Sequence, residues 1–82
     1  MNEDEIRRLV VRALCDVAPD IRPEKIDPKE NLREQLDLDS VDFMNFVVAL
    51  HEASGVDVPE SDYSKIASLD DCVAYLTRGG KS

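Results

Sequence analysis

The sequence is poor in the residues from which most enzyme and metal sites are built. It holds one histidine, two cysteines and no tryptophan in 82 residues. His51, Cys15 and Cys72 lie far apart along the chain, a set too sparse and scattered for a zinc site. The acidic start has none of the features of a secretion signal, so we expect reduced thiols in a cytoplasmic protein.

Long apolar runs and an excess of basic residues are also missing. No run approaches the roughly 18 residues of a membrane-spanning helix. Acids outnumber bases 18 to 10, and the net charge of −8 disfavours nucleic acid and anionic membranes as partners. Apolar residues make up 43%, too many for a disordered acidic tail, and the length predicts a single domain over residues 1–82.

Basic residues are unevenly distributed. Residues 34–64 hold eight acids and neither lysine nor arginine, whereas the flanking segments are nearly neutral. A solvated acidic face is the ordinary explanation of such a run. Natural surfaces usually mix both signs of charge, however, so the complete lack of bases favours a surface that binds a cationic partner.

The spacing of apolar residues predicts an all-α fold, a four-helix bundle with a long first loop and a short third helix. Asn2 can cap the first helix, Gly55 is a stop signal, and Pro59 suits the first turn of a helix. The predicted helices cover residues 2–18, 40–54, 60–66 and 69–78, with a loop at 19–39 and a frayed tail at 79–82.

The second predicted helix has apolar residues on two sides. At about 100° per residue, one face consists of Phe43, Phe46, Val47 and Leu50. A second stripe consists of Val41, Met44 and Val48. Either the helix is buried on both sides, or the second stripe is exposed with an acidic rim, which is typical of partner-binding surfaces.

Ser40 lies where the long loop meets this helix, between Asp39 and Asp42. A hydrolase nucleophile needs a nearby base, but His51 is roughly 16 Å further along the helix axis. The surrounding acids also lack the spacing of a calcium-binding loop. Two roles stay open: a simple capping or first-turn residue, or an acceptor that another protein modifies, since a helix N-terminus favours a phosphate.

The segment Asp39-Ser40-Val41-Asp42 resembles the Asp-Ser-Leu-Asp/Glu motif of acyl carrier proteins. Gly55-Val56-Asp57-Val58-Pro59 is similar to that family's link to its third helix, and residues 65–76 are similar to its last helix. The resemblance extends from about Glu5 to Leu76. It implies a helical bundle of acyl-carrier type that catalyses nothing itself.

The same resemblance implies that Ser40 carries 4′-phosphopantetheine, which a phosphopantetheinyl transferase installs from coenzyme A with magnesium. The chain would then be a monomeric phosphoprotein that presents acyl thioesters to enzymes of fatty acid, specialised lipid or secondary-metabolite synthesis. Asp39 and Asp42 would help to hold the transferase. The implied partner-binding residues are Val41, Met44, Val48, Asn45, His51 and Glu52. The implied acyl pocket consists of Phe46, Leu50, Ile66 and Cys72.

Three positions depart from the family's pattern. Asp37 stands where the family usually has glycine, and Asn45 and His51 stand where carriers of fatty acid synthesis commonly have glutamate. Two contacts with basic partners are thereby weakened, which predicts a specialised carrier rather than the housekeeping one. The alternatives are a carrier of amino-acyl, aryl or polyketide groups, or an unmodified helical module that binds partners through the apolar stripe alone.

Overall fold

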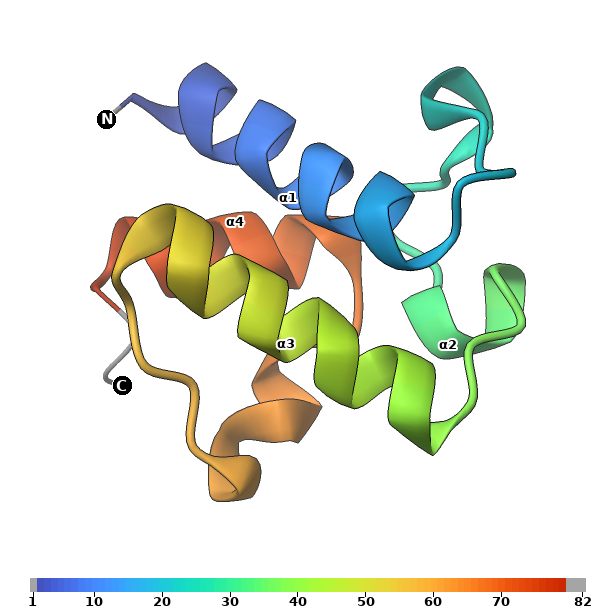
Figure 1. Ribbon diagram of the computed structural model, residues 1–82. Helices are drawn as coiled ribbons and strands as arrows, with labels where there is room; N and C mark the ends of the chain where they lie inside the picture. Colours follow the sequence, from blue (N-terminus) through green and yellow to red (C-terminus); the bar gives the residue numbers. More distant parts are fainter. Residues whose placement is uncertain (1, 80–82) are drawn as a thin grey trace.

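The computed structural model describes residues 2–79 and, within them, contains helices and no strand. Three longer helices, α1 (Glu3–Val17), α3 (Ser40–Ser54) and α4 (Leu69–Thr77), form the body of the molecule (Figure 1). Three short elements lie in the connections: the 3₁₀ helices η1 (Pro23–Lys25) and η2 (Glu60–Ile66), and the single-turn helix α2 (Leu32–Gln35). The expected all-α bundle is therefore observed, and its short third helix is a 3₁₀ helix.

The long helices begin and end where their terminal residues satisfy the backbone. The Asn2 side chain accepts a hydrogen bond from the Glu5 backbone at 2.9 Å, and Glu5 returns the interaction as a capping box. Gly55 ends α3 with a left-handed φ of 74° and donates its N–H to the His51 carbonyl at 2.7 Å. Of the frayed tail expected at 79–82, only Gly79 belongs to the described residues.

The core lies where α1 packs on α3 and α4, and η2 closes one side of it against α4. It is built from the apolar stripe of each long helix, because burying these faces is the main force that stabilises a small bundle. The helical core residues are Ile6, Val10, Ala13, Leu14, Leu32, Phe43, Phe46, Val47, Leu50, Ile66, Leu69, Cys72, Val73, Tyr75 and Leu76.

The connection between α1 and α3 is fixed to the core rather than loose. Leu32 is fully buried, and its backbone N–H donates to the Ala67 carbonyl at 2.7 Å. The Asp70 N–H donates to the Pro28 carbonyl at 3.0 Å. These two bonds join the loop to the segment that begins α4, so the chain entering α3 has a defined path.

Among residues 2–79, no helix combines the length and the apolar character that crossing a membrane requires.

Candidate functional site

Ser40 is the first residue of α3, and its side chain is exposed. Within the described part of the chain, no residue forms a hydrogen bond with its hydroxyl. Asp39 precedes it as the N-cap, with an extended backbone that turns the loop into the helix. An exposed, unbonded hydroxyl at this position is accessible to a modifying enzyme.

Asp39 and Asp42 form a reciprocal capping box around Ser40. The Asp39 Oδ1 accepts the Asp42 N–H at 2.8 Å, and the Asp42 Oδ2 accepts the Asp39 N–H at 3.5 Å. The first N–H groups of a helix have no partner inside it, so the box leaves those of Ser40 and Val41 as donors at the helix start. A phosphate ester on Ser40 would lie at this positive end of the helix dipole.

The loop reaches Ser40 through a left-handed residue. Asp37 has a φ of 55°, a conformation that glycine adopts easily and that aspartate tolerates better than most residues. The next residue, Leu38, is buried and donates its N–H to the Arg33 carbonyl at 2.9 Å. The position at which the resembled family usually has glycine is thus a sharp turn that sets the start of α3.

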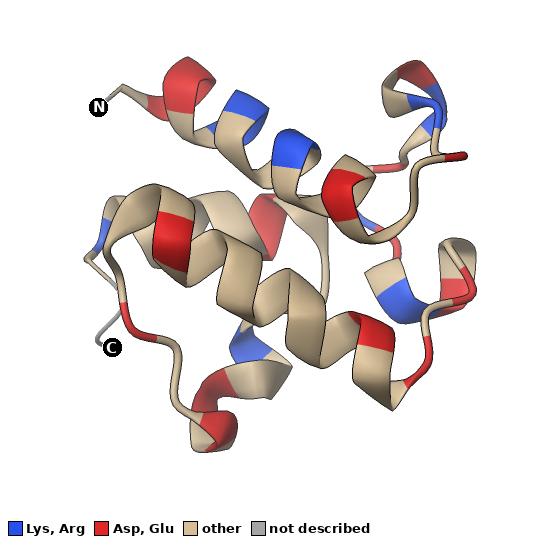
Figure 2. Ribbon diagram, viewed as in Figure 1, with Lys and Arg blue, Asp and Glu red and all other residues tan. Residues whose placement is uncertain are grey.

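The second apolar stripe of α3 is exposed. Val41, Met44 and Val48 have 64%, 57% and 52% of their surface accessible, whereas Phe46 and Leu50 on the other face have none. Of the two explanations left open by the sequence, burial on both sides is therefore wrong. Asn45 and Glu52 border the stripe and are exposed. Figure 2 shows acidic bands and no basic band along α3.

His51 lies near the other end of α3 from Ser40. Its Nδ1 is 3.2 Å from the Val56 carbonyl oxygen and 3.2 Å from the Asp57 Oδ1. The ring thus interacts with the chain that leaves the helix. Ser40 has no histidine beside it, and a serine hydrolase has no base here.

The four residues expected to form an acyl pocket are all fully buried in one cluster: Phe46, Leu50, Ile66 and Cys72. The Cys72 Sγ donates to the Ile66 carbonyl at 3.5 Å, and burial raises the pKa of this thiol to about 12. Cys72 is therefore a protonated core residue. An acyl chain could reach this cluster only by separating side chains that are packed together.

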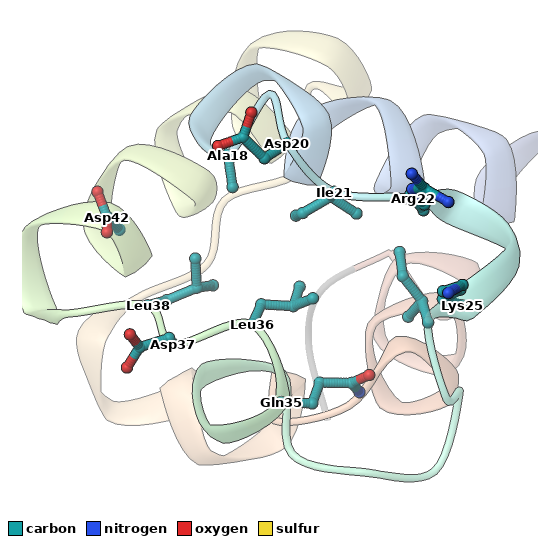
Figure 3. A pocket seen from close by; sticks show the side chains of 11 residues that line it. Ala18, Asp20, Ile21, Arg22, Lys25, Gln35, Leu36, Asp37, Leu38 and Asp42 are labelled. Carbon is teal, nitrogen blue, oxygen red and sulfur yellow. The ribbon is translucent and has the colours of Figure 1, made fainter.

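The sequence did not predict a groove of about 610 Å³ that lies between the end of α1 and the loop residues just before α3. Ala18 and Ile21 line one wall, and Leu36 and Leu38 line the opposite wall (Figure 3). No periodic pattern predicts it, because its walls come from the end of α1 and from two parts of the long loop. Among the described residues, no group of three or more acidic, histidine or cysteine side chains is placed to hold a metal ion.

Comparison with known proteins identifies the family of this chain. A family model described as a phosphopantetheine attachment site matches residues 5–76. The acyl carrier protein of Campylobacter hominis is 39% identical over 79 residues, which cover 96% of this chain and 94% of that protein. This chain belongs to the acyl carrier protein family.

Further acyl carrier proteins agree in sequence and in fold. That of Thermosynechococcus vestitus is 30% identical over 76 residues, covering 93% of each chain. The solved structure of the acyl carrier protein from Enterococcus faecalis superposes with a TM-score of 0.80 over 96% of this chain and 99% of that one, at 24% identity. The family resemblance and the all-α carrier fold are confirmed.

Membership of the family establishes the general role. The protein is a carrier and not an enzyme, its prosthetic group is 4′-phosphopantetheine, and it interacts with a phosphopantetheinyl transferase and with acyl-processing enzymes. The residues at the start of α3 fit such a group, because they combine an exposed hydroxyl with free helix N–H donors.

Proposed function

We propose that Ser40 is the residue of this single carrier domain that bears 4′-phosphopantetheine. The supporting observation is the exposed, unbonded Ser40 hydroxyl at the first position of α3, directly before the exposed stripe. Once attached, the group supplies a thiol that holds acyl cargo as a thioester. Enzymes that dock on the stripe would then lie beside the residue from which the cargo-bearing arm extends.

Intact mass spectrometry tests the attachment. The protein is incubated with coenzyme A, magnesium and a broad-specificity phosphopantetheinyl transferase, and the wild type should gain one phosphopantetheine. Ser40→Ala should gain none. Ser61→Ala, which removes another exposed serine, should be modified like the wild type. Modification of Ser40→Ala would show that the arm is attached elsewhere.

Docking rests on the apolar stripe with its acidic rim. Val41, Met44 and Val48 present apolar surface to partners, and Asp42 and Glu52 are the acids of α3 that attract basic enzyme surfaces. Met44→Gln should therefore lower kcat/KM of the transferase without changing the far-UV circular dichroism or the urea midpoint of the carrier. An unchanged kcat/KM would exclude Met44 from the docking surface.

We also propose that the carrier serves specialised lipid or secondary-metabolite synthesis rather than housekeeping fatty acid synthesis. Asn45 and His51 border the docking stripe and stand where fatty-acid carriers commonly have glutamate. The rim of the stripe therefore carries two fewer negative charges than in those carriers. Asn45→Glu/His51→Glu should therefore be loaded faster by a housekeeping malonyl transferase. Ala53→Glu, which adds charge to α3 on another side, should not be. Equal loading of the wild type and of that enzyme's own carrier would refute the specialisation.

We also propose that the acyl pocket lies in the core beside α3. Phe46, Leu50 and Ile66 are neighbours in the core, so an acyl chain that enters beside α3 must change the surroundings of all three. Octanoylation of the carrier should therefore shift their backbone amide resonances. Unchanged resonances at these three residues would place the cargo outside the bundle. The expectations of a monomer in the cytoplasm stay predictions.

A further inference from the structure

Arg33 is the last base before the long stretch that lacks bases, and it lies beside the proposed attachment site. Its guanidinium stacks over the Phe43 ring, with the Cζ 5.6 Å from the ring centroid. Arg33 belongs to α2, the single-turn helix that lies near the first turns of α3 (Figure 1). This contact brings a positive charge to the end of α3 that is otherwise bordered by acids.

Phe43 places that charge near Ser40. It follows Ser40 by three residues, so the two side chains are neighbours on the helix surface. Helical side chains also lean toward the N-terminus, so the Phe43 side chain extends toward the turn that contains Ser40. Contacts with Phe46 and Tyr63, at centroid distances of 5.9 and 5.5 Å, hold the ring in place. The guanidinium thus rests on a fixed platform.

The guanidinium has no acidic partner within residues 2–79. Arg7, by comparison, pairs with Asp70 at 3.0 Å. Arg33 is exposed, and none of its N–H donors bonds a carboxylate of the described residues. A guanidinium with free donors is well suited to a phosphate, which it can bind through two parallel hydrogen bonds.

The charges around Ser40 create a need for such a group. A phosphodiester on Ser40 carries a negative charge and would lie between the carboxylates of Asp39 and Asp42, which repel it. The helix dipole compensates only part of that repulsion, because its effect corresponds to roughly half a unit charge.

We propose that Arg33 binds the phosphate of the arm on Ser40 and so fixes the direction in which the arm leaves the protein. This inference rests on the proposed attachment at Ser40. Arg33 acts as a positioning residue: it would hold the first bond of the arm beside α3, next to the docking stripe, instead of letting the arm rotate freely about the serine side chain.

Phosphorus NMR of the modified protein tests the inference without any partner enzyme. Wild type, Arg33→Gln, Arg33→Lys and Arg12→Gln are each converted to the phosphopantetheine form and checked by intact mass. Arg12 is an exposed arginine on α1, so its variant makes the same change in net charge. The ³¹P resonance should move in Arg33→Gln, move less in Arg33→Lys, and stay in place in Arg12→Gln.

Two further readouts separate phosphate binding from simple packing on Phe43. The Arg33 Nε–H cross-peak of the wild type should shift when the arm is added. In urea titrations, Arg33→Gln should raise the unfolding constant about threefold more in the modified form than in the unmodified form, as for an exposed ion pair. This excess should fall at about 0.5 M salt.

The outcomes distinguish the two proposals. No added mass at Ser40 would overturn the attachment site and this inference with it. Normal modification with the same ³¹P position in wild type and Arg33→Gln, and with equal stability losses in both forms, would overturn the inference alone and leave Arg33 as a packing residue.

Discussion

Two adjacent valines of α3 provide a sharp test of which face of the helix supports the fold. Val47 is 6% exposed and lies in the core, whereas Val48 is 52% exposed and lies in the exposed apolar stripe with Val41 and Met44. Both are replaced by alanine. The two substitutions remove the same atoms and make the same gain in helix propensity, which therefore cancels when the variants are compared.

The expected difference follows from the burial. Two carbons are lost, and burying each contributes about 0.8 kcal/mol, so Val47→Ala loses about 1.5 kcal/mol and Val48→Ala about half of that. Val47→Ala also leaves a cavity, which costs up to about 1 kcal/mol more if the core does not collapse around it. We expect a gap of about 1–2 kcal/mol in the free energy of unfolding, or about 5- to 30-fold in the unfolding constant.

Urea unfolding followed by circular dichroism measures both variants in the unmodified protein. The slopes with urea should agree, so that the midpoints report stability directly. If Val48→Ala cost as much as Val47→Ala, another part of the protein or a second copy would cover the stripe in solution. The stripe would then not be available to partner enzymes. A midpoint that depends on protein concentration would identify the second copy as the cover.

Three further outcomes follow from single contacts. Burial and the hydrogen bond to Asp62 raise the pKa of Tyr75 to about 12, and the same 2.6 Å bond, with a smaller contribution from a nearby lysine, lowers the pKa of Asp62. A carboxyl group whose pKa is lowered in the folded state stabilises the fold at pH values above its unfolded-state pKa. Tyr75→Phe should therefore reduce stability at neutral pH. The reduction should shrink as the pH falls through the lowered pKa of Asp62. A thiol reagent should modify the half-buried Cys15 of the folded protein and reach Cys72 only after unfolding, since burial raises the Cys72 pKa to about 12. Gly55→Ala should lower the free energy of unfolding by about 1 kcal/mol, because its φ of 74° is unfavourable for alanine. A clash should add nothing, since a Cβ there would meet no atom within 4 Å.

Each of these outcomes has a clear contradiction. A pH-independent effect of Tyr75→Phe would mean that the Asp62 carboxylate does not depend on the phenol. Rapid labelling of Cys72 in the native state would show that the core opens readily at α4. A neutral Gly55→Ala would mean that the chain leaving α3 can adopt another turn.

The sequence predicted those parts of the molecule that depend on local periodicity. The α3 helix spans the residues in which two apolar stripes were recognised. One stripe is buried and the other is exposed, as the second of the two explanations required. Which explanation was right could not be read from α3 itself. Coverage of Val41, Met44 and Val48 depends on where the other helices and the loop lie, and this is set by packing over the whole chain.

Features made by distant segments were out of reach for the same reason. The contact of Arg33 with Phe43 depends on the path that the long loop takes. The hydrogen bond between Asp62 and Tyr75 joins η2 to α4, which meet only in the folded protein. The groove beside the α3 start combines side chains from α1 and the loop. Asp37 is the exception: it stands where the family usually has glycine, the residue that most easily adopts a left-handed backbone, and its φ of 55° is left-handed.

The two backbone hydrogen bonds that join the long loop to the start of α4 have a consequence for the order of folding. The Leu32 N–H needs the Ala67 carbonyl, and the Pro28 carbonyl needs the Asp70 N–H. Both pairs are distant in sequence, so they form only after the entropic cost of closing a large loop has been met. During synthesis, Ser40 leaves the ribosome well before these partners do. The loop that leads into Ser40 thus acquires its native path only when the segment that begins α4 is present, so a nascent chain that ends before Ala67 lacks the loop path of the folded protein.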